Sequence, residues 1–256
     1  MSGPTRAVHR LEVGTQPRLE VDIVAGEVRV RVGQPGVVAL TIETNDAAQI
    51  EVTQTGDTVS VHKPWGWSGR RRQVMVHAEV PEGTDVVVSA TSAEVRLDGS
   101  FGATKVHTVS GDITVGTIER GEVDSTSGDV KLRTTGALEA STISGDVSVG
   151  HVRGRLKASL TSGDLRADRV DGDAEVATMS GDVVIGRCDG DDISIRSVSG
   201  DLRLALPAGI RVEPDIATVS GKAVLPSTPA AATAGERRRV RLRLRTVSGD
   251  IRLERA

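Results

Sequence analysis

The chain has 256 residues, enough for one large domain or two ordinary ones, and its 32 Lys and Arg residues nearly balance its 35 Asp and Glu residues. This near-neutral charge does not indicate nucleic acid as a partner, and none is expected. With no Tyr, one Phe and two Trp, the core must be built from Val, Ile, Leu, Ala and Thr, which suits the narrow interior between β-sheets.

The amino-terminal segment lacks the apolar stretch of a signal peptide, and no run of 18 apolar residues occurs in the sequence. A single cysteine, Cys188, excludes an internal disulfide and permits a reducing compartment. These features predict a cytoplasmic protein with no transmembrane segment.

Residues 1–90 contain alternating apolar and polar residues with loosely spaced turns, as in Val21–Val32 and Gln54–Val61. We expect an irregular β amino-terminal or capping region here, formed by larger coils or by a small sheet that covers one end of a stack. An uncovered end would template edge-to-edge aggregation.

The loop Pro64–Arg72 concentrates side chains that are frequent in protein interfaces. Two interpretations stay open: a partner contact, or tryptophans that form a hydrophobic lid on the end of the stack. The residues concerned are Trp65, Trp67, Arg70, Arg71 and Arg72.

Residues 91–256 repeat the triplet Ser-Gly-Asp, with successive steps of 17, 17, 18, 18, 19, 21 and 28 residues when one Ser-Gly-Lys variant is included. Apolar residues recur three and five positions after each serine and four positions before it, which is the period of two expected for strands. An antiparallel meander would not require these columns to match. We therefore predict a single-stranded parallel β-helix, or β-solenoid, with coils of 17–21 residues. The triplets begin at Ser110, Ser127, Ser144, Ser162, Ser180, Ser199 and Ser248, and the variant begins at Ser220.

The triplet is interpreted as a structural corner, because Gly tolerates unusual backbone angles and Asp can accept hydrogen bonds from N–H groups just ahead of it. A ladder of calcium sites is the alternative, but the nine-residue calcium repeat of β-solenoids is absent. The corner residues are Gly111, Asp112, Gly128, Asp129, Gly145, Asp146, Gly163, Asp164, Gly181, Asp182, Gly200, Asp201, Gly249 and Asp250.

Two further columns flank the corner. Two residues before the serine stands Thr or Ser in all repeats but one, and we expect these hydroxyls to hydrogen-bond along the stack. The residue immediately before the serine is often apolar, and we expect a bulge to turn it inward. The latter residues are Val109, Ile143, Met179, Val198, Val219 and Val247.

Two neighbouring repeats carry Asp-rich turns 18 residues apart, which would stack Asp171 and Asp173 beside Asp189 and Asp191. Such carboxylates repel one another unless they are protonated, splayed into water or bridged by a hard cation. They are the weak calcium candidates; splaying is the favoured interpretation, and no cofactor is predicted.

Near the carboxyl end, residues 226–236 are interpreted as a flexible insertion that explains the 28-residue step. Beyond them, arginines alternate with apolar residues and form an outward basic face on the last coil. This face either discourages sheet pairing, or binds an anion or an acidic partner through Arg241 and Arg243.

The run of corners from Ser92 to Leu253, behind a looser β amino-terminal part, resembles the bacterial Toastrack family of adhesin-like β-strand repeats. The resemblance implies a β-helix of unknown function without catalytic residues, and a scaffold role in envelope-stress assemblies.

The five histidines, at positions 9, 62, 77, 107 and 151, share no phase of the repeat and adjoin no candidate nucleophile. The sequence therefore predicts a non-catalytic scaffold or protein-interaction module with an unidentified protein partner, and self-association stays open. A polymerising or surface-adhesive solenoid is the alternative, and a glycan-active β-helix enzyme is the third interpretation.

Overall fold

The computed structural model describes residues 5–44, 50–62, 73–225 and 238–255, and within these ranges the chain consists of strands and turns without a helix. Accordingly, the described ranges hold no helix that is long and apolar enough to cross a membrane. The chain divides into two compact units, Met1–Arg133 and Thr134–Ala256. The regular repeat of the sequence begins near residue 91. This position lies inside the first unit, within the continuous strand β7 (Asp85–Ser110).

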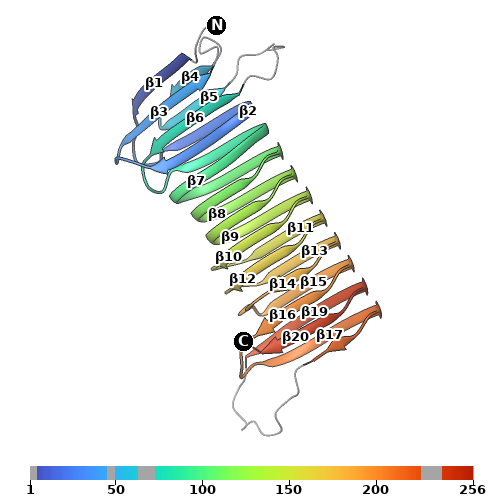
Figure 1. The fold of residues 1–256 in the computed structure, drawn as a ribbon. Coiled ribbons are helices and arrows are strands. Elements are labelled where there is room, and N and C mark those ends of the chain that lie inside the picture. Colours follow the sequence, from blue (N-terminus) through green and yellow to red (C-terminus); the bar gives the residue numbers. More distant parts are fainter. Residues whose placement is uncertain (1–4, 45–49, 63–72, 226–237, 256) are drawn as a thin grey trace. The chain divides into compact units, whose positions relative to one another are not determined.

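The first unit combines parallel coils with a small antiparallel layer (Figure 1). Strand β2 pairs in parallel with β7 along one edge and with β5 and β6 along the other, and β7 pairs in parallel with β8. Strand β3 runs antiparallel between β1 and β6, while β4 runs antiparallel beside β5. The bounds are β1 (Thr5–Glu12), β2 (Arg18–Val32), β3 (Val37–Thr44), β4 (Glu51–Thr55), β5 (Thr58–His62), β6 (Val74–Val80), β7 (Asp85–Ser110) and β8 (Ile113–Ser127). Strand β2 is thus already a parallel coil, with antiparallel strands beyond it.

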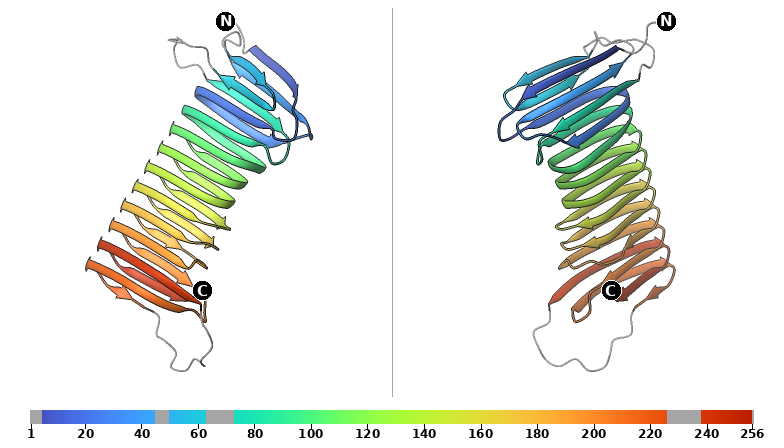
Figure 2. Two further views of the ribbon diagram at one scale, coloured as in Figure 1. Left: turned by 180° about the vertical axis from the view of Figure 1, so that it is seen from behind. Right: turned by 60° about the vertical axis from the view of Figure 1, so that its left-hand side comes forward.

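The second unit is the regular parallel β-solenoid that the repeat predicts, and its strands stack as successive rungs (Figure 2). Each coil gives one strand to a first sheet, before the corner, and one to a second sheet, after it. The strand β9 (Val130–Ser144) runs through both sheets: its first part pairs with β10, and Leu138–Ser144 pair with β11 in the first sheet. The other first-sheet strands are β11 (Leu156–Ser162), β13 (Ala174–Ser180), β15 (Asp192–Ser199), β17 (Arg211–Ser220) and β19 (Arg239–Ser248). The second-sheet strands are β10 (Val147–Val152), β12 (Leu165–Val170), β14 (Val183–Ile185), β16 (Leu202–Leu206), β18 (Ala223–Val224) and β20 (Ile251–Arg255).

The order of coils in space differs from their order in the sequence. Strand β19 pairs with β15 on one side and with β17 on the other, and β20 likewise lies between β16 and β18 (Figure 1). The final segment of the chain therefore fills the penultimate layer of the second unit, and the earlier coil β17–β18 forms the end. The expectation that the arginine-rich strand is the last coil is wrong for this reason.

The strands on either side of the basic strand β19 offer carboxylates to its arginines. Arg241 reaches Asp192 on β15 at 3.1 Å, and Arg245 reaches Asp215 on β17 at 2.7 Å. With β17 stacked directly on β15 and β19 at the end, Arg241 would lose its partner on β15. Each exposed pair contributes at most about 1 kcal/mol, so the pairs select the register more than they stabilise it.

The core of the second unit is a set of aligned aliphatic columns. One column stacks Leu156, Ala174, Ile193 and Leu242, each at most 1% exposed. Alternating large and small aliphatic side chains fill the narrow space between the two sheets, which explains how the chain dispenses with aromatic residues.

The hydroxyl column hydrogen-bonds along the stack less than expected. The hydroxyl of Thr218 donates to the carbonyl of Gly249 in the adjacent coil at 3.2 Å. That of Thr246 donates to the carbonyl of Ser248 in its own coil at 3.3 Å. Those of Thr142, Thr178 and Ser197 are buried without a hydrogen-bond partner, so the expectation is wrong for these three.

Candidate interaction surface

The Ser-Gly-Asp triplet forms the corner between the two sheets, and its aspartate binds the neighbouring coil. In the second unit the N–H of Asp164 donates to Oδ1 of Asp146 at 2.9 Å, that of Asp182 to Asp164 at 2.8 Å, and that of Asp201 to Asp182 at 2.8 Å. The series continues with Asp250 on Asp201 at 2.8 Å. We call this row the aspartate ladder. The expected acceptor role is right in kind, but the donor belongs to the next coil and not to residues just ahead in the chain.

The corner glycine serves two purposes. Gly181 has a φ of 135°, which is unfavourable for residues with a side chain, and the other corner glycines behave alike. A Cβ atom at Gly181 would also lie 2.1 Å from the carbonyl oxygen of Gly163 in the adjacent coil. The N–H of Gly181 meanwhile donates to the carbonyl of Ser199 at 3.0 Å. Close backbone approach and positive φ together require glycine here.

The apolar residues that precede the corner serines point outward, so the predicted inward bulge is wrong. All six are exposed, from 43% for Val109 to 83% for Val219. Buried and exposed positions alternate strictly along each first-sheet strand up to the hydroxyl column, which puts the next residue on the outer face. The alternation of apolar and polar residues before each corner already predicts this outward direction.

In the second unit, four of these residues occupy consecutive layers. The strand register aligns the residues that flank Met179 with those that flank Val198, so these two residues lie in adjacent layers. In the same way Val198 lies beside Val247, and Val247 lies beside Val219. We call these four residues the apolar column. Isolated exposed hydrophobic residues are ordinary, whereas a contiguous row marks a surface that excludes water on binding.

Two arginines lie beside the apolar column, on the side away from the corner. They are Arg196 and Arg245, in adjacent layers. Arg245 is paired with Asp215, whereas Arg196 is exposed and forms no ion pair with the described residues. This outer face thus has an apolar row with two arginines beside it.

The two arginines predicted as partner contacts have different surroundings. Arg241 is committed to Asp192 at 3.1 Å. Arg243 lies between Ser194 and Asp215 in the register and is half-buried. Arg241 is thus bound to a neighbouring strand, as Arg245 is to Asp215 at 2.7 Å, and Arg196 is the exposed arginine of this face without an ion pair to the described residues.

The four stacked aspartates of the predicted weak calcium site are separated by cations. Arg169 donates to Asp171 at 2.6 Å and also reaches Asp189 at 3.3 Å, and His151 contacts Asp171 at 2.7 Å. The hydrogen bond from Arg169 holds the pKa of the Asp171 carboxyl below its ordinary value, and the one from His151 acts in the same direction. Repulsion between the carboxylates is thus relieved by guanidinium groups.

The other two aspartates of that set turn to different partners. Oδ1 of Asp173 accepts the N–H groups of Asp191 and Asp192, both at 3.0 Å. The carboxylate of Asp191 pairs with Arg238. The four carboxylates do not converge, and no group of three or more His, Cys, Asp or Glu suited to a metal ion occurs in the part of the chain that the structure describes.

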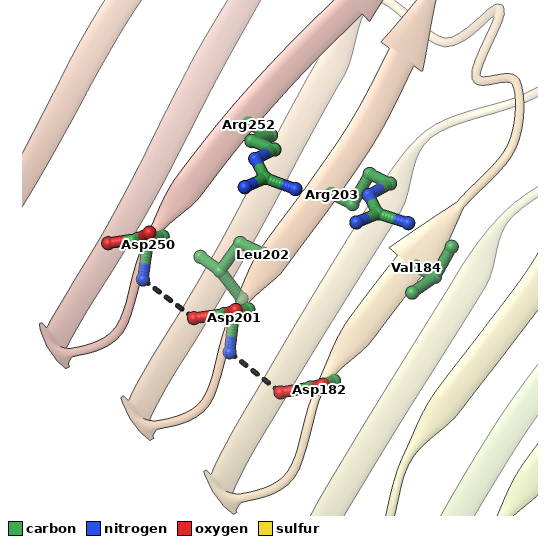
Figure 3. A pocket seen from close by; sticks show the side chains of 7 residues that line it. All are labelled: Asp182, Val184, Asp201, Leu202, Arg203, Asp250 and Arg252. Carbon is green, nitrogen blue, oxygen red and sulfur yellow. Dashed lines mark hydrogen bonds between the residues drawn. The ribbon is translucent and has the colours of Figure 1, made fainter. Parts of the chain in front are cut away.

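A groove on the second sheet runs beside the aspartate ladder (Figure 3). Carboxylates of Asp182, Asp201 and Asp250 form one wall, and the guanidinium groups of Arg203 and Arg252 form the other. Arg203 has a long contact of 3.9 Å with Glu254. Because the walls carry opposite charges, the groove favours neither an anion nor a cation.

The remaining predicted site, Trp65, Trp67 and Arg70 to Arg72, lies outside the described residues. Cys188 is buried and aligned with Val170, as expected for a small apolar side chain, and burial raises the pKa of its thiol to about 11. Among the described histidines, the carboxylate contacts are His151 with Asp171 and His62 with Glu51. Neither pair adjoins a nucleophile.

Solved structures similar to the chain come from bacteria. A "putative adhesin" of Parabacteroides distasonis is 10% identical, with 98% of this chain and 97% of that chain covered and a TM-score of 0.41. A "putative adhesin" of Bacteroides fragilis is 16% identical, with 78% and 97% covered and a TM-score of 0.40. A "putative lipid binding protein" of Parabacteroides distasonis is 10% identical, with 98% and 97% covered and a TM-score of 0.41.

No curated protein matches the chain. The family model described as Toastrack DUF4097, by contrast, matches residues 17–255, which is nearly the whole sequence. With this match and the repeated Ser-Gly-Asp corners of its solenoid, the chain belongs to the Toastrack DUF4097 family.

Proposed function

We propose that this protein is a non-catalytic interaction module that binds its partner through the apolar column of the second unit. The observation that carries the proposal is the exposure of Met179, Val198, Val247 and Val219, which is 50% or more at each. The fold does not require apolar residues at these positions, since Thr161 occupies the equivalent place in the neighbouring coil.

The surroundings of the column support binding rather than catalysis. It lies on the flat outer face of a parallel sheet, which presents an extended contact surface. Interfaces commonly combine an apolar centre with a charged rim, and Arg196 lies beside the column in such a position. The family is one of unknown function, so the link to envelope-stress assemblies and the cytoplasmic location stay predictions.

Affinity capture from the native host, with quantitative mass spectrometry, tests the proposal. The variant combines Met179→Ser, Val198→Ser and Val247→Ser, and Val224→Ser is the matched control because Val224 is 53% exposed on the second sheet. We expect the triple variant to lose capture at least tenfold, or about 1.4 kcal/mol, while the control retains it. Equal capture by both would refute the proposal, and cell fractionation in the same host tests the location.

A further inference from the structure

The outermost coil of the second unit, formed by β17 and β18, interrupts the regular succession of coils. Strand β15 pairs directly with β19, so that Ser199 lies beside Ser248, although these two serines are 49 positions apart in the sequence. The preceding corners of this unit are 18 or 19 positions apart. Strand β16 likewise pairs directly with β20. The solenoid is thus continuous without β17 and β18, which we call the end coil and which lie over the continuous stack.

The end coil packs more loosely than the coil that it covers. No residue of 207–225 is buried, and the inward-facing Val212 and Ile216 are half-buried. The aligned residues of β19, Val240 and Leu244, are at most 1% exposed. Burial of apolar surface is the main source of stability for a packed strand. The end coil should therefore separate from β19 at a lower free energy than an inner coil separates from its neighbours.

The outward side chains of β17 match those of β19 poorly. The register places Arg211 directly beside Arg239, so two like charges adjoin. It also places the uncharged Ala217 beside Arg245, which turns instead to Asp215 at 2.7 Å. A strand with carboxylates at the positions of Arg211 and Ala217 would fit this edge better than β17 does.

We propose that the edge of β19 is a binding site for an extended acidic segment of a partner protein, and that the end coil occupies this site until the partner displaces it. The end coil displays the mode of binding, because β17 pairs in parallel with β19 from Arg211 to Ser220. The partner segment adds a strand to the exposed edge, with main-chain hydrogen bonds for affinity and alternating side chains for specificity. This surface is separate from the face of the apolar column, and the inference does not rest on the function proposed for that column.

Charge selects an acidic partner. Strand β19 directs four arginines outward within ten residues, Arg239, Arg241, Arg243 and Arg245. Arg241 is engaged by Asp192 on the opposite side, and Arg243 forms no ion pair with the described residues. Carboxylates placed opposite these arginines attract them, whereas a basic segment is repelled, and discrimination between partners depends on both effects.

Fluorescence anisotropy with a labelled peptide tests the acidic preference in the full chain. The peptide follows β17 from residue 211 to residue 220, with Arg211→Glu and Ala217→Glu to add carboxylates and Pro214→Val to raise strand propensity. The comparison peptide carries lysine at positions 211, 213, 215 and 217. We expect saturable binding of the acidic peptide and at least tenfold weaker binding of the basic one. Equal binding of the two, or no binding of the acidic peptide, would overturn the inference.

A disulfide lock tests displacement of the end coil. Val219→Cys and Val247→Cys place two thiols at exposed positions of β17 and β19 whose flanking residues are aligned. Aligned Cα atoms on adjacent strands are about 4.8 Å apart, which suits a disulfide, and the native Cys188 is buried. The reduced double variant should bind the acidic peptide, and the oxidised form should bind it at least tenfold more weakly. Both states carry the same substitutions in the apolar column, so the column does not account for such a loss. Equal affinity in the two states would refute displacement.

Hydrogen exchange of the wild-type chain tests opening without a peptide. The N–H of Arg211 donates toward β19, and every second amide of β17 after it points the same way. These amides should exchange at least tenfold faster than the amides of β15, which has a strand on each side. Equal protection of β17 and β15 would show that the end coil opens only when the whole unit unfolds, and it would overturn the inference.

Discussion

The backbone N–H of Asp182 donates a hydrogen bond to Oδ1 of Asp164 at 2.8 Å, although the two residues are 18 positions apart. Two further bonds join the same pair of corners: the N–H of Gly163 donates to the carbonyl of Ser180 at 3.1 Å, and that of Leu165 to the carbonyl of Asp182 at 2.9 Å. The aspartate side chain thus satisfies a corner N–H that these backbone bonds do not reach. A corner without this side chain would leave that N–H to water.

Asp164→Ala should therefore destabilise the protein by about 1 kcal/mol, the usual contribution of one hydrogen bond. Asp164→Asn keeps an acceptor oxygen and should cost less. Equilibrium denaturation measures both, with Asp168→Ala, an exposed aspartate outside the ladder in the same coil, as the control. Equal losses for Asp164→Ala and Asp168→Ala would show that the ladder contributes nothing to stability.

Gly181→Ala should destabilise by at least about 3 kcal/mol, above the usual range for backbone strain alone. The added Cβ would lie 2.1 Å from the carbonyl oxygen of Gly163, so the coils would have to separate. Gly209→Ala is the matched control, since Gly209 also has a positive φ, of 80°, but a Cβ at this position would have no atom within 4 Å. The difference between the two unfolding free energies reports the contact with the adjacent coil together with the less accessible φ of Gly181; no difference would mean that a positive φ alone accounts for the corner glycine.

The repeat predicts the solenoid, its coil length and its corners, because matched columns have a physical meaning only when equivalent residues stack. The aspartate acceptor role also follows from the sequence, although the identity of its donor depends on the neighbouring coil. The outward direction of Met179 and Val198 follows from the strict alternation of inward and outward side chains along a strand. The expectation of a bulge at the corner led to the wrong direction.

The position of β19 could not be predicted in the same way. Its apolar residues fit any layer of the stack equally well, so the hydrophobic pattern leaves the order of coils undetermined. The observed order brings together Arg241 with Asp192 and Arg245 with Asp215, which are residues 49 and 30 positions apart. Such partners become visible only when the stack is assembled.

The thiol of Cys188 should be unreactive toward thiol reagents in the native protein at pH 8. Burial raises its folded-state pKa from 9.0 to about 11, so the neutral thiol is the favoured form in the fold. The corresponding stability is fully present below pH 9 and is lost as the pH rises toward 11. The difference in unfolding free energy between wild type and Cys188→Ala should therefore shrink over this interval. Rapid labelling of native protein at pH 8 would contradict the burial on which the argument depends.

Pro214 should protect the end of the second unit against strand addition. The N–H of Arg211 donates to the carbonyl of Arg238 at 3.0 Å, toward β19. Successive residues of a strand direct their N–H groups to opposite edges, so the nitrogen of Pro214 faces the other edge of β17, with which no described strand pairs. Proline on the open side of an edge strand removes a donor that another chain could use.

Pro214→Thr restores that donor with a residue of high strand propensity. It should leave the unfolding free energy unchanged within about 0.5 kcal/mol, as surface substitutions do, and it should produce species larger than those of the wild-type protein, increasing with protein concentration. Dynamic light scattering and sedimentation velocity measure this, and Pro207→Thr, in the segment between β16 and β17, is the control. If Pro214→Thr stays as small as the control at every concentration, the end coil is protected by some other feature, and the exposed Val224 and Leu225 beside it would have to be tested next.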